Sequence, residues 1–540
     1  NWAEVFQYLN YHSPKKITDV VLSGQGVNDT IASLISANTS WINLKILDLS
    51  KSEIGDEGVH GIASNETWIN LETLILHTNN IGDDGAKALG SNTVWKKLKR
   101  LELNCNDISE YGAEALCRNK AWTNLEVLYL YENPIRSFVT TPLGRNTVWT
   151  KLKKLSLRLT KIDDVEVGFL AENPSYPEME ELYLDQNEIG DDGIQSILGN
   201  KEWKNLTVLS LALNEIGPRG AATIGSLENP KLEELHLEKN RIRNEGAIRI
   251  GHNSSWRSLQ RLILEDNEIG DEGAVALGNN TAWKNLQVLS LSNNSIGSIG
   301  AAAIGRNETW ANLVVLDLEK NRIDDEGAKA IGNNTTWNKL EELLLTQNAI
   351  GQEGAIAIAQ NKTWTNLRIL QLTKNSIGKA GAIALGRNDV WVNLEKLTLS
   401  SNYIGDEGAI GLGLNESWVN LTQLYLQGNQ IGKAGAVGLA KNGAWKKLRL
   451  LHFQNNPIDN EGAIALSKNT TWTQLQEIQL VYNEVTYKGL VALANSLTWN
   501  LSTFGIRRNP DLTKERVAAL KSNCFMKIIA TSEDIEDEDW

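Results

Sequence analysis

The chain has 540 residues, of which 41 % are hydrophobic, and a formal net charge of −13 at pH 7. Nucleic acid is not expected as a partner, because phosphate binding needs a clustered lysine and arginine surface that the sequence lacks. No apolar run reaches the roughly 18 residues of a membrane span. Three cysteines, Cys105, Cys117 and Cys524, are too few for a disulfide framework and favour a reducing, cytoplasmic location.

Residues 1–16 precede the first repeat and are expected to form an N-terminal cap. Because the chain begins at Asn1 without a signal-peptide pattern, we expect a processed native N-terminus, and the sequence does not reveal its targeting.

From Ile17 onward a tryptophan recurs every 27 residues, with Tyr176 and Pro230 in the two gaps and one unit of 26 residues. The series comprises Trp41, Trp68, Trp95, Trp122, Trp149, Trp203, Trp256, Trp283, Trp310, Trp337, Trp364, Trp391, Trp418, Trp445, Trp472 and Trp499. Self-similarity at a fixed period predicts a repeat architecture. Each tryptophan lies three residues before the first leucine of a predicted strand, so we expect a buried ladder rather than a ligand-binding array.

The unit Leu286–Trp310 represents the repeat. Alternation around Leu289 and Leu291 predicts a short strand with one buried face. Asn294 follows three residues after the last strand leucine and has equivalents along the chain. A polar side chain repeated beside a core needs its amide satisfied, which predicts an asparagine ladder bonded to backbone groups.

The second half of each unit, such as residues 270–280, predicts a short helix. Asp271 suits the N-cap of that helix, and Asn280 with its equivalents suits a left-handed residue that ends it. Gly273 and its equivalents are expected to let the helix lie close to the strand layer.

Two consecutive units, Leu125–Trp149 and Leu152–Tyr176, depart from this pattern. The packing glycine is replaced by Val139 and then Glu166, and the ladder asparagine becomes Thr160 in the second unit. Prolines enter or flank the helical halves at Pro142, Pro174 and Pro177. Deviations from a self-consistent pattern are expected where function or strain requires them, although a tolerant surface region is an alternative explanation.

The last repeat ends near residue 511. We expect a capping helix and strand over 512–531 and a solvated acidic tail over 532–540, which holds six acidic residues. Residues 17–511 would then form one continuous repeat array.

These patterns resemble the leucine-rich repeat, in its ribonuclease-inhibitor-like subfamily, which includes Ran GTPase-activating protein and the sensor domains of NOD-like receptors. The resemblance implies an α/β solenoid, a horseshoe or superhelix of about 19 units of 27 residues, with an inner parallel β-sheet and outer helices. Strands stack about 4.8 Å apart and helices about 8–10 Å, so each step would bend by about 20°. The expected result is a large concave binding surface.

No catalytic constellation, metal site or cofactor is predicted. The six histidines show neither metal-ligand spacing nor a paired nucleophile. Segments such as residues 185–193 resemble a calcium loop, but Ile189 stands where a ligand is needed. We therefore expect no enzymatic activity.

Fifteen Asn-x-Ser/Thr sequons occur, many of them before tryptophan. The possible glycosylation sites of a secreted chain include Asn65, Asn253, Asn307, Asn361, Asn415 and Asn469. An asparagine is needed at this place by the predicted helix end in any case, so an extracellular location is the alternative to a cytoplasmic one.

Solvent-facing residues around the second and third leucines of each unit are the candidate partner-binding residues. They are Tyr129, Tyr131, Arg158, Leu159, Tyr183, Asp185, Glu238, Glu265, Asp266, Asp317, Glu319, Tyr425, His452 and Tyr482, with Arg507 and Arg508 near the end. Tyrosine and arginine dominate binding hot spots. The acidic residues in the middle of the series predict a protein partner with a basic surface.

The sequence thus predicts a non-enzymatic protein-binding scaffold that uses the concave face of the solenoid. One alternative is a small-GTPase regulator, by analogy with Ran GTPase-activating protein and its acidic tail. Another is a secreted, N-glycosylated structural or adhesive protein. The sequence identifies neither the partner nor the oligomeric state.

Overall fold

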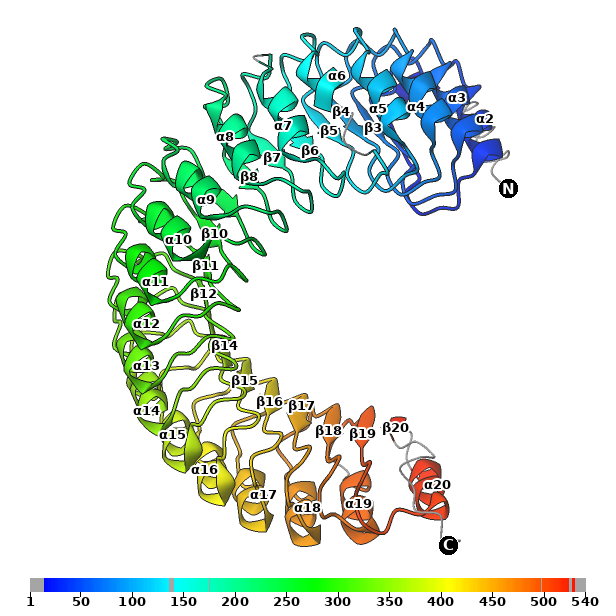
Figure 1. Cartoon of the computed structure of the whole chain (residues 1–540). Coiled ribbons are helices and arrows are strands. Elements are labelled where there is room, and N and C mark those ends of the chain that lie inside the picture. Colours follow the sequence, from blue (N-terminus) through cyan, green and yellow to red (C-terminus); the bar gives the residue numbers. More distant parts are fainter. Residues whose placement is uncertain (1–13, 136–139, 174, 497, 524–526, 530–540) are drawn as a thin grey trace, which may run out of the picture. The chain divides into compact units, whose positions relative to one another are not determined.

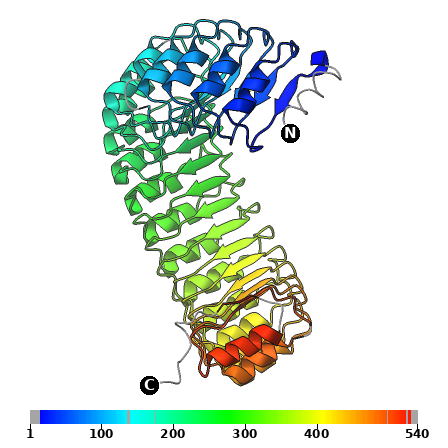
Figure 2. The same ribbon diagram turned by 90° about the vertical axis from the view of Figure 1, so that its right-hand side faces the viewer.

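A computed structural model describes residues 14–135, 140–173, 175–496, 498–523 and 527–529 (Figure 1). The chain forms two compact units, Asn1–Leu259 (unit 1) and Gln260–Trp540 (unit 2). In each unit short strands stack on one side and helices on the other (Figure 2). Most of the predicted N-terminal cap, the acidic tail, Val139, Pro174 and Cys524 lie outside the described residues.

Unit 1 alternates three-residue strands with helices mostly of eight or nine residues. Its strands are β1 (Asp19–Val21), β2 (Ile46–Asp48), β3 (Thr73–Ile75), β4 (Arg100–Glu102), β5 (Val127–Tyr129), β6 (Lys154–Ser156), β7 (Glu181–Tyr183), β8 (Val208–Ser210) and β9 (Glu234–His236). Its helices are the 3-10 helix η1 (Pro14–Lys16), α2 (Asp29–Ser36), α3 (Asp56–Ala63), α4 (Asp83–Gly90), α5 (Glu110–Cys117), α6 (Thr140–Gly144), α7 (Asp164–Ala171), α8 (Asp191–Gly199), α9 (Pro218–Gly225) and α10 (Arg243–Gly251).

Unit 2 repeats the same alternation. Its strands are β10 (Arg261–Ile263), β11 (Val288–Ser290), β12 (Val315–Asp317), β13 (Glu342–Leu344), β14 (Ile369–Gln371), β15 (Lys396–Thr398), β16 (Gln423–Tyr425), β17 (Leu450–His452), β18 (Glu477–Gln479), β19 (Thr503–Gly505) and β20 (Lys527–Ile529). Its helices are α11 (Asp271–Gly278), α12 (Ser298–Gly305), α13 (Asp325–Gly332), α14 (Gln352–Gln360), α15 (Gly378–Gly386), α16 (Gly405–Gly413), α17 (Lys433–Ala440), α18 (Asn460–Ser467), α19 (Tyr487–Ala494) and α20 (Lys514–Asn523).

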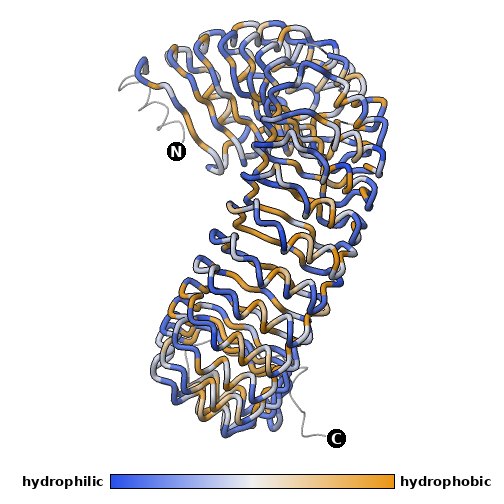
Figure 3. Tube along the Cα trace, turned by 90° about the vertical axis from the view of Figure 1, so that its left-hand side faces the viewer, coloured by the Kyte–Doolittle hydropathy of each residue, from blue (hydrophilic) through white to orange (hydrophobic). Residues whose placement is uncertain are grey.

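The strands of each unit pair in parallel and in register. Leu289 of β11, for example, lies opposite Leu316 of β12, and Ser290 lies opposite Asp317. Equivalent residues of successive repeats therefore stand side by side, and the hydrophobic residues recur at the same points of each repeat (Figure 3). The predicted strand and helix of each repeat are confirmed.

The tryptophan ladder is buried, as the sequence predicts. Trp310 and most of its equivalents have no exposed surface. The rings of Trp445 and Trp472 stack with centroids 6.3 Å apart, and those of Trp122 and Trp149 with centroids 6.2 Å apart. The ladder therefore belongs to the core and offers no ring to a ligand.

The asparagine ladder beside the strands is also confirmed. The Nδ2 of Asn294 donates to the carbonyls of Leu264 and Leu291, at 2.9 and 3.0 Å, and its Oδ1 accepts from the backbone N–H of Ile269. Each such side chain joins its own repeat to the one before it, so the ladder links neighbouring repeats.

Asp271 does not cap its own helix, contrary to the sequence-based expectation. The N-cap of α11 is Gly270, and Asp271 is the first helical residue. Its Oδ1 accepts from the backbone N–H groups of Gly297 and Gly300, at 2.8 and 2.7 Å, at the start of the next helix. The aspartate thus satisfies amides that begin helix α12, which lack partners within that helix.

Asn280 and its equivalents do not end their helices in the left-handed conformation, so this prediction is wrong. Helix α13, for example, is followed by Asn333 with a right-handed backbone. Asn307 donates from Nδ2 to the carbonyls of Gly278 and Asn280 in the preceding repeat, at 2.7 and 2.9 Å. These asparagines form a second ladder, which reaches backwards like the first.

The packing glycines bring helices against helices rather than against the strand layer. A Cβ added at Gly300 would lie 2.7 Å from the Cβ of Ala274 and 2.9 Å from Oδ1 of Asp271, both on the preceding helix. Only glycine therefore fits the spacing between α11 and α12.

Candidate functional site

Side chains that point away from the core form a strand face in each unit. The residue between the two strand leucines of a repeat occupies this face, and so does the residue after the second leucine. In unit 1 the register places Tyr129 of β5 beside Ser156 of β6, and Ser156 beside Tyr183 of β7. Equivalent residues of three successive repeats thus form a continuous surface.

Tyr129, Tyr131, Arg158 and Tyr183 make up what we call the tyrosine surface. The rings of Tyr129 and Tyr131 lie with centroids 6.2 Å apart, and the guanidinium of Arg100 lies 5.4 Å from the centroid of the Tyr129 ring. All three tyrosines are half-buried. Their apolar rings are fixed by neighbours while part of each remains open to solvent.

Polar contacts hold the other end of this surface. The hydroxyl of Tyr183 donates to Oε2 of Glu181 at 2.9 Å, and Lys154 pairs with the other oxygen of the same carboxylate. Arg158 pairs with Asp185 at 3.0 Å between Nε and Oδ2. The cations of the surface are therefore already matched by acids, which makes a free anion a poor ligand here.

Asp185 lies beneath the tyrosine surface rather than on it. It is only 3 % exposed, and its Oδ1 accepts from the hydroxyl of Ser210 and the backbone N–H of Ala212. Its charge is used to fix Arg158, so it supports the surface and contributes little to an acidic patch.

Burial raises the pKa of Tyr129 and Tyr131 above the ordinary phenol value. Burial also raises the pKa of Tyr183, with the nearby Glu181 carboxylate adding to the effect. The three phenols are therefore neutral at physiological pH, and they act as hydrogen-bonding groups rather than as bases or nucleophiles.

Tyr129, Tyr131 and Arg158 lie in the two repeats whose sequence departs from the pattern, and Tyr183 lies in the next repeat. Thr160 replaces the ladder asparagine, and the N–H of Ile135 donates to the carbonyl of Asn133 instead of to a ladder side chain. Glu166, which replaces a packing glycine, forms a capping box with Asp163 at the start of α7. Helix α6 is described over Thr140–Gly144 and contains Pro142. The departures change both the ladder and the helix layer.

Leu159, Asp266 and Tyr482 lie one residue beyond the strand face. They occupy the turn after the strand in the left-handed conformation, with φ of 55°, 55° and 56°. Leu159 is 47 % exposed and Tyr482 is 56 % exposed. These residues belong to the edge of the surface rather than to its strand positions.

The six predicted acidic residues are divided between the two units. Asp185 and Glu238 belong to unit 1, whereas Glu265, Asp266, Asp317 and Glu319 belong to unit 2. In unit 2 the intervening strand β11 presents Ser290, whose hydroxyl donates to Asp317 at 3.1 Å. Burial raises the pKa of Asp317 and of Glu319 above the ordinary carboxyl values.

A second aromatic group lies on strands β16 and β17 of unit 2. Tyr425 and His452 meet edge to face with centroids 4.8 Å apart, and Nε2 of His452 lies 3.0 Å from Oε1 of Glu477. Burial lowers the pKa of His452, and the Glu477 carboxylate opposes that shift. Lys396 lies 5.9 Å from the centroid of the Tyr425 ring.

Sequence reasoning missed Glu181, Lys154, Lys396 and Glu477, which hold these aromatic residues in place. All four are the first residue of their strand and precede its buried leucine or isoleucine. That position also faces outward. Extending the outward-facing series of each strand by two residues toward the N-terminus would have identified it.

The described residues contain no group of three or more histidine, cysteine or acidic side chains that could hold a metal ion. Nor does that part of the chain include a helix long and apolar enough to cross a membrane.

The sequons before tryptophan place their asparagine in the second ladder. Asn65, Asn253, Asn307, Asn361, Asn415 and Asn469 are all buried, and the Nδ2 of each donates to two backbone carbonyls. An amide nitrogen carries two hydrogens, and a glycan replaces one of them. A glycan at these sites would therefore remove a bond and occupy the space between repeats.

We predict that a folded chain made in a glycosylating cell carries no glycan at Asn307 or Asn361. The sequon at Asn333 is a matched control, because this asparagine is exposed at the end of α13. Site-by-site mass spectrometry of the folded fraction measures the occupancy. A glycan on Asn307 in natively folded material would show that the second ladder is dispensable.

A sequence model of the Leucine Rich repeat matches more than half of the chain, and the chain belongs to this family. The matched segments are 42–63, 69–90, 96–117, 179–198, 204–225, 228–251, 257–278, 284–305, 311–332, 338–359, 365–386, 392–413, 419–440, 446–467 and 473–494. The two departing repeats, which contain α6 and α7, are skipped. The family confirms the predicted repeat solenoid. No curated protein matches the chain in sequence.

Solved structures of leucine-rich-repeat proteins share this fold at low sequence identity. The ectodomain of the Arabidopsis receptor kinase HAESA is 18 % identical with a TM-score of 0.50, covering 95 % of this chain and 82 % of that one. An internalin from Listeria monocytogenes is 20 % identical with a TM-score of 0.44, covering 72 % and 93 %. A Leptospira interrogans protein is 20 % identical with a TM-score of 0.43, covering 98 % of each.

Proposed function

We propose that this chain is a non-enzymatic scaffold that binds a protein or peptide on its strand face, with the tyrosine surface of unit 1 as the main contact. The observation that carries the proposal is a set of half-buried tyrosines held by Arg100, Glu181 and the Arg158–Asp185 pair. Tyr129 and Tyr131 lie in the first of the two repeats that depart from the family pattern, and Tyr183 lies in the repeat that follows them. Rigid aromatic residues bind with little loss of side-chain entropy. The HAESA ectodomain was solved with a peptide hormone, so a peptide is a partner class to test.

Replacing Tyr129, Tyr131, Arg158 or Tyr183 with alanine should each weaken partner binding by at least about tenfold, as expected for a hot-spot side chain. Tyr111→Ala is the matched control, because Tyr111 is 64 % exposed on helix α5, outside the strand face. Immobilised chain and variants would be compared in one extract of the source cell, followed by affinity measurements on the protein they retain.

Folding of each variant is checked by its melting temperature. Affinities that stay within about threefold of the unchanged chain for all four variants would remove the tyrosine surface from consideration. Equal loss with Tyr111→Ala would point to a general effect of the substitution.

We further propose that the acidic residues of unit 2 attract a partner with a basic surface. Reversing Glu265 or Asp317 to lysine should slow association and reduce its dependence on salt, because clustered charge acts mainly on the encounter rate. Glu272→Lys on helix α11 makes the same change in net charge away from the strand face. Stopped-flow or biosensor kinetics at several ionic strengths provide the measurement.

Lowering the pH should weaken this attraction before ordinary carboxyls are protonated. Because burial raises the pKa of Asp317 and Glu319, both carboxyls lose their charge as the pH falls while ordinary carboxyls are still ionised. An association rate that is unchanged by ionic strength and by both charge reversals would contradict an electrostatic role for these residues.

The other functions suggested by the sequence can be separated from this one. The first alternative is a regulator of a small GTPase, by analogy with Ran GTPase-activating protein. Such a protein would change the rate of GTP hydrolysis in a direct assay. A secreted glycoprotein would carry glycan mass in native material. The acidic tail on which the first analogy depends lies outside the described residues. We place the scaffold in the cytoplasm, given its sparse cysteines and its buried sequons.

A further inference from the structure

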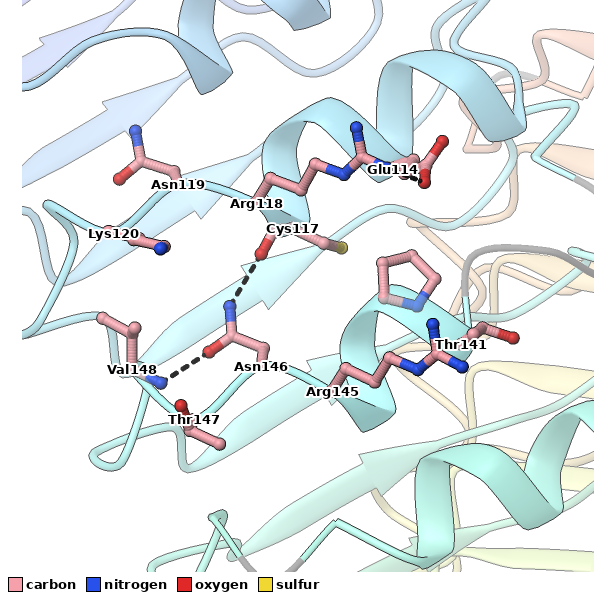
Figure 4. A pocket seen from close by; sticks show the side chains of 11 residues that line it. Glu114, Cys117, Arg118, Asn119, Lys120, Thr141, Arg145, Asn146, Thr147 and Val148 are labelled. Carbon is pink, nitrogen blue, oxygen red and sulfur yellow. Dashed lines mark hydrogen bonds and ion pairs between the residues drawn. The ribbon is translucent and has the colours of Figure 1, made fainter.

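A cavity of about 420 Å³ lies between the C-terminal ends of helices α5 and α6 in unit 1 (Figure 4). Its lining includes Cys117 and Arg118 at the end of α5, Lys120 in the following loop, and Thr141 and Arg145 from α6 and its end. The cavity lies among the helices, away from the strand face, and is independent of the proposed function.

Cavities at this place recur between successive helices, and this one lies beside a helix end that differs from the usual one. Most helices end on a glycine, and a Cβ added at Gly90 or Gly305 would lie 2.4 or 2.6 Å from the backbone of the next helix. Helix α5 ends instead on Cys117, whose side chain is buried.

The lining carries an excess of positive charge. Arg118 pairs with Glu114 one helical turn earlier, at 2.6 Å. Arg145 is its equivalent one repeat later, but Thr141 stands where the matching acid would be. Arg145 and Lys120 make no ion pair among the described residues. Two exposed cations therefore border one cavity without a counter-charge, in a chain whose net charge is −13.

Two comparable cavities elsewhere carry no excess of positive charge. Between α12 and α13 the lining holds Arg306 and Lys329 together with Glu308 and Glu326, and Lys329 pairs with Glu326 at 2.9 Å. Between α7 and α8 it holds Glu172 and Glu202 with a single lysine, Lys201. The excess of cations at α5 and α6 is thus a property of this cavity and not of the repeat.

We propose that the α5–α6 cavity binds a phosphate-type dianion, with Arg145 as the charged group that contacts it and Lys120, on the opposite side of the cavity in Figure 4, adding positive charge. A guanidinium presents paired N–H donors that match phosphate oxygens, and a lysine adds a compact charge. The hydroxyl of Thr141 lies on the same rim as a further donor. Burial raises the pKa of the Cys117 thiol, so the floor of the cavity is neutral and unreactive.

The test measures binding of inorganic phosphate, phosphoserine and serine by calorimetry at constant ionic strength, with chloride as the balancing anion. We expect saturable binding of phosphate or phosphoserine and none of serine. Tighter binding of phosphoserine would identify a phosphorylated side chain as the source of the dianion, and tighter binding of inorganic phosphate would identify the free ion. Absence of saturable binding by both would overturn the proposal.

Two variants locate the site. Arg145→Gln removes the unpaired guanidinium, and Thr141→Glu supplies the acid that α5 has at the equivalent position. Each should weaken binding by at least about tenfold, the usual effect of losing a charge-assisted contact. Arg306→Gln, in the balanced cavity of unit 2, is the matched control and should leave affinity unchanged. Unchanged binding in both unit 1 variants, with normal melting, would sink the assignment to this cavity.

Discussion

Trp310→Ala should lower the free energy of unfolding by about 3–5 kcal/mol, the usual cost of emptying a large buried site. The indole of Trp310 has no exposed surface and belongs to a ladder that continues through the neighbouring repeats. Removing it leaves a cavity between repeats that the surrounding leucines cannot close without shifting the strands. Urea unfolding followed by circular dichroism measures the change.

Ile299→Ala is the control for this substitution, because Ile299 is 69 % exposed on helix α12 of the same repeat. It should alter stability by less than about 0.5 kcal/mol. Trp310→Phe should cost less than alanine, since the indole N–H has no hydrogen-bond partner and a phenyl ring keeps much of the apolar contact. A loss below about 1 kcal/mol for the alanine variant would refute a structural role for the ladder.

The strand positions and the tryptophan ladder could be predicted because they depend on spacing within one repeat. Leu289 and Leu291 alternate with polar residues, and the three-residue spacing from Trp283 to Leu286 recurs in most units. Burial then follows from repetition, because identical repeats stacked in register place identical residues side by side. These features need no knowledge of which repeat touches which.

Asp271 and Asn307 show where local rules fail. Capping rules assign a side chain to the helix that contains it, yet Asp271 bonds to Gly297 and Gly300 of the next repeat. Asn307 likewise bonds to carbonyls of the preceding repeat instead of ending a helix with a left-handed backbone. The solenoid offers Asp271 and Asn307 partners 26 to 29 residues away, which single-helix rules do not consider.

The candidate surface could be placed by sequence only in part. Tyr129 and Tyr183 were assigned to the outward face from alternation alone, and the structure places them there. Asp185 was assigned to the same face, but Arg158 and Ser210 on adjacent strands bury it. Which side chain covers its neighbour depends on side-chain geometry between adjacent strands. A periodic sequence pattern does not contain that information.

Asn294→Leu is expected to be the second most damaging single change, although leucine is more apolar and similar in size. Two backbone N–H groups, of Asn267 and Ile269, donate to its Oδ1 at 3.1 and 2.9 Å. Its Nδ2 in turn donates to carbonyls that include Leu264. Each group left buried and unpaired costs about 1–3 kcal/mol, which exceeds what burial of one leucine side chain offers at this half-buried position.

Asn293→Leu is the matched control for that loss. Asn293 is exposed and left-handed, with φ of 52°, and the equivalent positions Leu159 and Leu213 already hold leucine in the same conformation. The control should therefore fold with nearly unchanged stability, while Asn294→Leu unfolds at lower urea concentration. Hydrogen exchange adds a local readout, because the amides of Asn267 and Ile269 should lose protection before their neighbours do. Neutral or increased stability in Asn294→Leu would mean that other groups satisfy these amides.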